Sequence, residues 1–238
     1  MHFAFLILHF FRIMIVAIDG PAGAGKSTVS RQLARRLGFQ FLDTGAMYRA
    51  VAWAALERGH DWNQPERLVE LARGLAIEMT DTGVKVDSVD VSQAIRSQRV
   101  TGYLKYSADN AGVRGILVER QRAFAVGKQI VTEGRDQGSV VFPQAECKIY
   151  LTASAEERAQ RRVADLARRG ETANFEQVLS EQNERDRRDM SRAVGPLVQA
   201  PDATVLNTDH LTEAEVVDAL VSVVHEHCRQ LGLEPPGK

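Results

Sequence analysis

A glycine-rich run near the start of the chain has the residue types that bind nucleotide phosphates. It reads Gly20-Pro21-Ala22-Gly23-Ala24-Gly25-Lys26-Ser27-Thr28 and contains the full pattern G-x-x-x-x-G-K-[ST]. Glycines let backbone N–H groups converge on phosphate oxygens, Lys26 can neutralise the β- and γ-phosphates, and the Ser27 hydroxyl can bind Mg²⁺. We therefore expect this run to bind ATP, with Mg²⁺ held through Ser27. The motif does not identify the phosphoryl acceptor.

Two later segments place polar side chains directly after apolar runs. The first, Leu42–Arg49, offers Thr44 and Arg49, and the second, Glu133–Gly138, offers Arg135 and Asp136. Ligands gather at such strand ends in open α/β sheets. Arg135 can hold a phosphate through two hydrogen bonds, and Asp136 can accept one from an exocyclic amine such as cytosine N4. The structural alternatives are a helix cap, a surface charge and an Arg–Asp pair without a ligand.

Arginines are dense in two further segments, 158–169 and 185–192. Phosphoryl transfer passes through a transition state rich in negative charge, so a mobile lid carrying arginines is the expected partner of a phosphate-binding loop. Most arginines on a charged helix are solvated. We expect a subset to act in catalysis, and the candidates are Arg158, Arg162 and Arg185, with Asp189 beside them.

Positioning these residues requires strands that alternate with helices, which indicates a three-layer α/β domain around a parallel sheet. Met14–Asp19 has the apolar pattern of a central buried strand. The other expected strands are Phe39–Leu42, Gln129–Thr132, Lys148–Leu151 and Thr204–Asn207. The expected helices are Lys26–Leu37, Thr44–Arg58, Gln98–Ala108, Gly112–Val126, and three that begin after the capping residues Ser154, Asn174 and Thr212.

A small antiparallel insert interrupts this alternation from about residue 63. It consists of a helix at Pro65–Leu75 and two extended runs, Ala76–Thr80 and Val84–Val91, joined by a turn at Asp81-Thr82-Gly83.

Composition excludes several other classes of protein. The chain has 238 residues, 30 basic and 31 acidic, so its formal net charge is −1 and there is no bulk attraction for nucleic acid or a membrane. Cys147 and Cys228 are too few for a disulfide framework, which is typical of the cytoplasm. The apolar start, residues 1–13, lacks the features of an export signal and is interpreted as a non-native or dispensable extension, with Met14 as the natural start. The tail, 233–238, is expected to fray.

Five segments resemble bacterial cytidylate kinases, in the same order and at similar spacing. They are GPAGAGKST at 20–28, LDTGAMYR at 42–49, EGRDQGSVVFP at 133–143, SAEERAQRR at 154–162 and ERDRRDMSRAVGPL at 184–197. The resemblance covers about residues 14–228. It implies a P-loop kinase domain at 14–232, a monomer, with a monophosphate-binding lobe at about 44–128 that includes an insert at about 63–110. It also implies a lid at about 155–170.

The resemblance further implies transfer of the γ-phosphoryl group of ATP to CMP or dCMP, in pyrimidine nucleotide metabolism. Arg49, Arg114 and Arg192 would hold the monophosphate. Arg135 and Asp136 would read cytosine, and Thr44 would also contact the nucleotide, with Arg185 and Asp189 in the same pocket wall. Transfer would be direct and in line, with Mg²⁺, Lys26 and lid arginines stabilising the transferred group and no general base.

Two positions depart from the family pattern. Lys105 stands where the family has a base-contacting serine, and Ser107 follows two residues later. Either Ser107 takes over that contact or it is lost, which affects the preference for CMP over UMP. The insert segment Val86–Val91 also lacks the glycine that is usual in its turn, and we expect a local adjustment. The alternatives are a kinase for UMP, AMP, dTMP or another metabolite, and a regulatory module switched by ATP.

Overall fold

A five-stranded parallel sheet forms the centre of the protein in the computed structural model, which describes residues 13–80, 83–168 and 170–237. The strand order is β2-β6-β1-β7-β8. The strands are β1 (Ile15–Asp19), β2 (Gln40–Asp43), β6 (Ile130–Gly134), β7 (Cys147–Thr152) and β8 (Thr204–Asn207). β1 and β6 are central and almost entirely buried, as their apolar sequences predict. Asp19 on β1 lies opposite Gly134 on β6, and Asp43 on β2 lies opposite Glu133 on β6.

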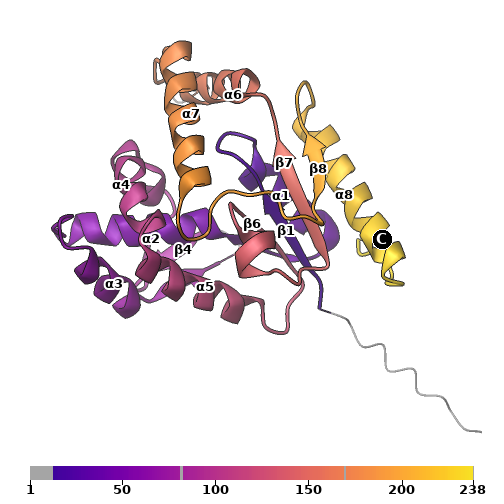
Figure 1. Ribbon diagram of the computed structural model, residues 1–238, viewed down its shortest axis with the longest axis horizontal. Helices are drawn as coiled ribbons and strands as arrows, with labels where there is room; N and C mark the ends of the chain where they lie inside the picture. The colour runs from indigo at the N-terminus through magenta and orange to yellow at the C-terminus, as the bar shows by residue number, and fades with distance from the viewer. Residues whose placement is uncertain (1–12, 81–82, 169, 238) are drawn as a thin grey trace, which may run out of the picture.

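Helices cover both faces of the sheet, which gives the predicted three-layer α/β arrangement (Figure 1). On one face α1 (Lys26–Leu37) and α8 (Glu213–Gln230) pack with β1 and β7 around Ile18, Leu33 and Leu220. On the other face α2 (Thr44–Glu57), α3 (Pro65–Gly74) and α5 (Ala111–Ala125) pack around Leu42, Val51 and Leu117. Cys147 and Cys228 lie fully buried in the first of these cores as free thiols, where they act as packing residues.

The insert is antiparallel, as predicted. Its strands β3 (Ile77–Met79), β4 (Val84–Val86) and β5 (Val89–Asp90) pair in that order. The first predicted turn, at 81–83, lies mostly outside the described residues. In the turn between β4 and β5, Asp87 and Ser88 adopt φ of 49° and 70°. Two non-glycine residues therefore adopt the left-handed backbone conformation that glycine usually provides. A 3₁₀ turn, η1 (Ala94–Arg96), and α4 (Gln98–Ala108) follow.

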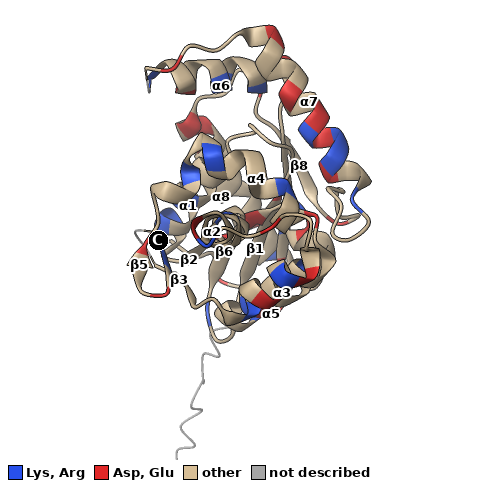
Figure 2. Ribbon diagram, turned by 90° about the vertical axis from the view of Figure 1, so that its left-hand side faces the viewer, with Lys and Arg blue, Asp and Glu red and all other residues tan. Residues whose placement is uncertain are grey.

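Two further helices, α6 (Ala155–Arg168) and α7 (Phe175–Ser191), stand together above the sheet as a hairpin (Figure 1). We call them the α6–α7 hairpin. Ala159, Leu166 and Val178 form a small apolar core between them. In Figure 2 much of the α7 ribbon has the colours of acidic and basic residues.

Three features of residues 84–141 were not predicted. The expected run Val84–Val91 divides into β4 and β5, and η1 was not expected. Residues Gln137–Val141 also form an unexpected π-helical turn, η2, shortly after β6. Among the described residues, no helix is long and apolar enough to span a bilayer.

Candidate active site

The glycine-rich loop joins β1 to α1 at the carboxyl end of the sheet. Gly20, Gly23 and Gly25 all have positive φ. A Cβ at Gly20 would overlap the Leu151 carbonyl, so only glycine fits there. The Lys26 ammonium donates to the carbonyls of Gly20 and Pro21 at 2.8 and 2.7 Å. Burial, reinforced by the Arg135 guanidinium, lowers the pKa of Lys26 to about 7.

A buried carboxylate pair lies beside the loop. The Ser27 hydroxyl donates to Glu133 Oε1 at 2.7 Å, and Asp43 is the cross-strand neighbour of Glu133. Burial, with Asp43 nearby, raises the pKa of Glu133. Hydroxyl and carboxylate oxygens are the donors that Mg²⁺ prefers in proteins. Sequence reasoning found Ser27 but missed Glu133, although its place at the end of the strand next to β1 was a usable signal.

Asp19, at the end of β1, fixes the turn that carries Asp136. Its two carboxylate oxygens accept hydrogen bonds from the backbone N–H groups of Gln137 and Gly138, at 2.8 and 2.7 Å. Burial raises the pKa of Asp19 to about 6. The π-helical turn therefore has a defined position relative to the loop.

The residues predicted to bind the acceptor converge through ion pairs. Arg114 pairs with Asp136 Oδ2, and its guanidinium lies 5.3 Å from the ring centre of Tyr48. Asp189 receives hydrogen bonds from Arg135 at 2.8 Å and from Arg192 at 2.6 Å. Burial raises the pKa of Asp136. For Asp189 burial opposes ionisation, but Arg135 and Arg185 outweigh it and hold the pKa low.

Gly195 makes this cluster possible. Its φ is 62°, and a Cβ there would overlap the Arg114 guanidinium and the Asp136 carboxylate. Sequence reasoning missed this glycine because its neighbours come from other segments of the chain.

Arg49 is held by the insert and by α4. Its guanidinium donates to Thr101 Oγ1 at 2.8 Å and to the Ile95 carbonyl at 3.4 Å. Burial lowers the pKa of Arg49, while Asp43 opposes this and Arg96 adds to it. The Thr44 hydroxyl donates to the Glu133 backbone carbonyl at 2.7 Å, which ties α2 to β6.

Lys105 and Ser107 take different positions on α4. The Ser107 hydroxyl is fully buried and donates to the carbonyls of Tyr48 and Leu104, at 2.9 and 3.0 Å. Lys105 is exposed, with its ammonium 5.1 Å from the ring centre of Tyr106. It lies one helical turn after Thr101, the partner of Arg49, and one turn before Asp109, the partner of Arg192. Lys105 therefore lies on the same stripe of α4 as Thr101 and Asp109.

The candidate catalytic arginines of the α6–α7 hairpin differ in their surroundings. Arg158 is 6% exposed and bonded to the loop, whereas the side chains of Arg162 and Arg185 form no hydrogen bond within the described residues. Burial, together with Arg135, lowers the pKa of Arg185 to about 10. The charges of Arg162 and Arg135 both lower the pKa of Arg49, so these guanidinium groups lie near that of Arg49.

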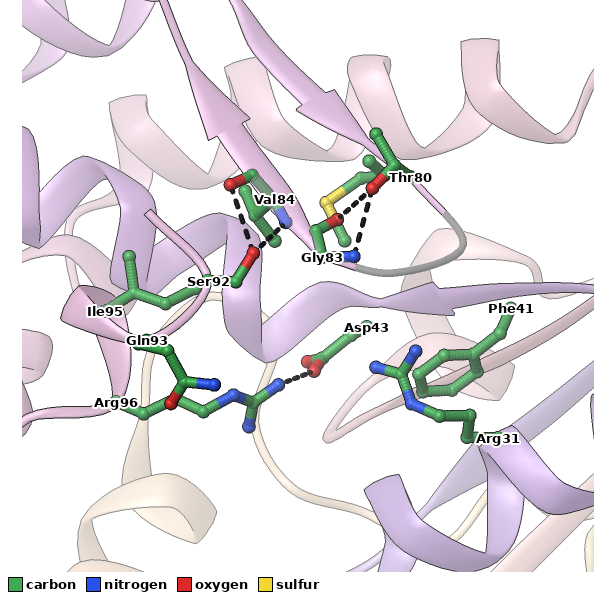
Figure 3. Close-up of a pocket in the computed structure, with 11 residues that line it drawn as sticks. Arg31, Phe41, Asp43, Thr80, Gly83, Val84, Ser92, Gln93, Ile95 and Arg96 are labelled. Atoms are coloured by element: carbon green, nitrogen blue, oxygen red, sulfur yellow. Dashed lines mark hydrogen bonds and ion pairs between the residues drawn. The ribbon is translucent and has the colours of Figure 1, made fainter. Parts of the chain in front are cut away.

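A pocket of about 190 Å³ borders this region on the insert side (Figure 3). Asp43 lies in it and accepts a hydrogen bond from Arg96 at 3.0 Å, while Arg31 covers the Phe41 ring on the other side. The pocket therefore borders the Asp43–Glu133 pair and does not lie over the glycine-rich loop.

The chain is similar to proteins of one named family. A family model described as cytidylate kinase matches residues 16–226. A cytidylate kinase of Rhodopirellula baltica is 48% identical over 90% of this chain and 93% of its own length, and one from Shewanella pealeana is 43% identical over 90% and 96%. A bifunctional pantoate ligase/cytidylate kinase of Synechococcus sp. is 44% identical over 92% of this chain, which spans 42% of that longer relative.

Proposed function

The chain belongs to the cytidylate kinase family, and from that premise we propose that it transfers the γ-phosphoryl group of ATP to CMP or dCMP. The products are ADP and CDP or dCDP, in pyrimidine nucleotide metabolism. The observation that carries the proposal is the arginine cluster opposite the phosphate-binding loop, which gives a second anion its own site. A protein that only bound or hydrolysed ATP would not need that site.

On the donor side, the backbone of residues 20–28 surrounds the β-phosphate, and Lys26 contacts the β- and γ-phosphates. Lys26 must leave the Gly20 and Pro21 carbonyls to do so. The negative charge of the phosphates then favours its protonated form.

Mg²⁺ would be held by Ser27, with Glu133 accepting from the ion's water ligands. The donor set fits the ion, because Mg²⁺ in kinases takes one or two protein oxygens and fills its other positions with phosphate and water. Bound there, it would neutralise charge on the phosphates.

On the acceptor side, Arg49, Arg114 and Arg192 hold the monophosphate, and Arg135 and Asp136 read cytosine. Asp136 Oδ1 has no hydrogen bond within the described residues, so it can accept one from the cytosine amine while Oδ2 keeps Arg114. The raised pKa of Asp136 agrees with a group that gains a donor when the base binds.

The transfer step needs charge stabilisation more than proton transfer. The acceptor phosphate is largely ionised at neutral pH, so no general base is required. Within the described residues, the side chains of Arg162 and Arg185 form no hydrogen bond or ion pair, and we assign these two candidate catalytic arginines to the equatorial oxygens of the transferred group. Closure of the α6–α7 hairpin as a lid would exclude water, which otherwise competes as acceptor. We also propose that the reaction takes place in the cytoplasm and that the enzyme is a monomer.

An acceptor panel tests the proposal. CMP, dCMP, UMP and AMP are compared at saturating ATP and Mg²⁺ by release of ADP, with diphosphate products identified directly. We expect CMP and dCMP to have the highest kcat/KM. Highest activity with AMP, or ADP release that needs no acceptor, would exclude the assignment.

We expect Lys105 to determine how strongly the enzyme prefers CMP over UMP. An ammonium only donates, so it can contact the carbonyl of either base and cannot recognise the cytosine amine. We expect Lys105→Ser to raise the CMP:UMP ratio of kcat/KM about three- to ten-fold, the value of one hydrogen bond. Ser107→Ala is the matched variant, and it should destabilise the protein without changing the ratio. A ratio that moves with Ser107 and not with Lys105 would reverse the assignment.

A further inference from the structure

Two side chains of the α6–α7 hairpin grip a single residue of the glycine-rich loop. The Ala22 N–H donates to Asp186 Oδ1 at 3.1 Å, and Arg158 Nη1 donates to the Ala22 carbonyl at 2.7 Å. The same Nη1 donates to Asp186 Oδ2 at 2.5 Å. Arg158 comes from α6 and Asp186 from α7, so three segments meet at Ala22.

This arrangement leaves Arg158 little freedom. Its Nε also donates to the Ala153 carbonyl at 3.1 Å, and Arg158 and Asp186 are each only 6% exposed. Gln182, one turn before Asp186, donates to the Arg158 carbonyl and packs so closely that a Cβ at Gly23 would collide with it. A guanidinium with three acceptors inside the protein is poorly placed to follow a phosphoryl group in transfer.

Arg162 and Arg185, whose side chains form no hydrogen bond or ion pair in the described part of the chain, are adjacent to Arg158 and Asp186 in sequence. Arg162 lies one helical turn after Arg158 on α6, and Arg185 directly precedes Asp186 on α7. Residues four apart on a helix share a face. The position of Ala22 relative to the hairpin therefore fixes where both cations stand above the loop.

We propose that Arg158 and Asp186 are a positioning pair. The pair holds the loop at Ala22 as a clamp and thereby fixes the positions from which Arg162 and Arg185 contact the transferred phosphate. Arg158 acts through the loop and does not itself contact the phosphate. This rests on the proposed phosphoryl transfer, because Arg162 and Arg185 take their catalytic role from it.

Steady-state kinetics of Arg158→Met, Asp186→Asn and the double variant test the pair, with Arg162→Met as the matched variant on the same helix. Either single change leaves a buried group without its partner, so each should raise KM for ATP about ten-fold and lower kcat, with the affinity for CMP alone unchanged. The double variant should be no worse than the poorer single one, because both remove the same clamp. Arg162→Met should lower kcat at least as much while KM for ATP changes less than about three-fold.

Hydrogen exchange at the Ala22 amide gives a second measurement, in full-length protein without nucleotide. Asp186→Asn weakens the acceptor of that amide, so its exchange should accelerate while β1 and β6 stay protected. If a kinetic variant does not fold, Arg158→Lys, which keeps a cation and part of the bonding, should show the same KM pattern in weaker form.

Two outcomes would overturn the proposal. One is additive loss in the double variant, and the other is a fall in kcat for Arg158→Met with KM for ATP and Ala22 exchange unchanged; either would make Arg158 a phosphate ligand. Failure of the wild-type protein to phosphorylate CMP would count against the proposed function. The Ala22 exchange result and ATP affinity would still decide the clamp.

Discussion

Individual charges in this site are buried, and most of them have a named partner. Asp189 forms ion pairs with Arg135 and Arg192, and Asp136 forms one with Arg114. Glu133 accepts a hydrogen bond from the Ser27 hydroxyl. Buried charges are stable only when paired, so each substrate group must compete with or add to a pair that already exists. Lys26 is the clearest case, because its partners in the nucleotide-free protein are backbone carbonyls.

The charge of Lys26 makes ATP binding depend on pH. Because burial lowers its pKa to about 7, Lys26 is largely neutral above that pH in the free protein, and bound phosphates raise the pKa again. Binding at pH 8 should therefore take up close to one proton, and ATP affinity should fall as pH rises above about 7. Calorimetry in two buffers of different ionisation enthalpy measures the uptake.

Lys26→Arg is the control for that measurement. Arginine stays charged throughout this range, so the variant should bind ATP without proton uptake, whatever its affinity. Equal uptake by the variant and the wild type would assign the proton to another group.

Sequence reasoning at the residue scale succeeded where the signal was local. The loop, Arg135 and Asp136 stand in short motifs whose chemistry can be read directly. Glu133 and Asp109 were missed because their partners, Ser27 and Arg192, lie 106 and 83 positions away. Pairings of that kind depend on sheet register and helix packing, which no single-sequence pattern specifies.

At the scale of elements, α7 joins the two halves of the site. Asp186 bonds to the donor loop, and Asp189, one turn later, bonds to the acceptor arginines. The expected strands and helices formed almost as predicted, since apolar periodicity and caps such as Thr212 are local properties. The turn η2 was missed because its support is Asp19, more than a hundred residues earlier.

Gly195 offers a test of how closely the segment after α7 approaches the acceptor site. Gly195→Ala should raise KM for CMP about ten-fold or more, because the new Cβ displaces Arg114 and Asp136. KM for ATP should change little. Steady-state kinetics with each substrate varied in turn measures both.

Gly59→Ala is the matched control. Gly59 has a φ of 63°, nearly that of Gly195, but no atom lies within 4 Å of its added Cβ. It should cost about 1 kcal/mol of stability from backbone strain and leave both KM values unchanged. If the two variants behave alike, backbone strain and not the collision explains the effect at Gly195.

At the scale of the whole molecule, one ion pair connects the segment after α7 to the end of α4. Arg192 donates to Asp109 at 2.8 Å, and Asp109 is partly exposed while Arg192 is buried. In the function proposed above, Asp109 therefore competes with the acceptor phosphate for Arg192.

Asp109→Asn should lower KM for CMP two- to five-fold, which corresponds to the 0.5–1 kcal/mol or so of a partly exposed ion pair. The gain should shrink in high salt, which screens the pair. Glu57→Gln removes the exposed ion pair between Glu57 and Arg99 and is the control. It should change neither KM for CMP nor the dependence of that KM on salt. A higher KM in Asp109→Asn would mean that Asp109 holds Arg192 in place for the phosphate.

Because both cysteines are buried, site-specific probes can be attached to cysteines introduced elsewhere in the otherwise wild-type chain. Both thiols are fully enclosed in the core, and burial raises the pKa of Cys147 and of Cys228, so neither offers an accessible thiolate. One cysteine introduced on the exposed face of α6 and another on α4 would react alone with a maleimide dye. Energy transfer between the dyes would then report how far the hairpin travels as each nucleotide binds, in a protein whose own cysteines need no replacement.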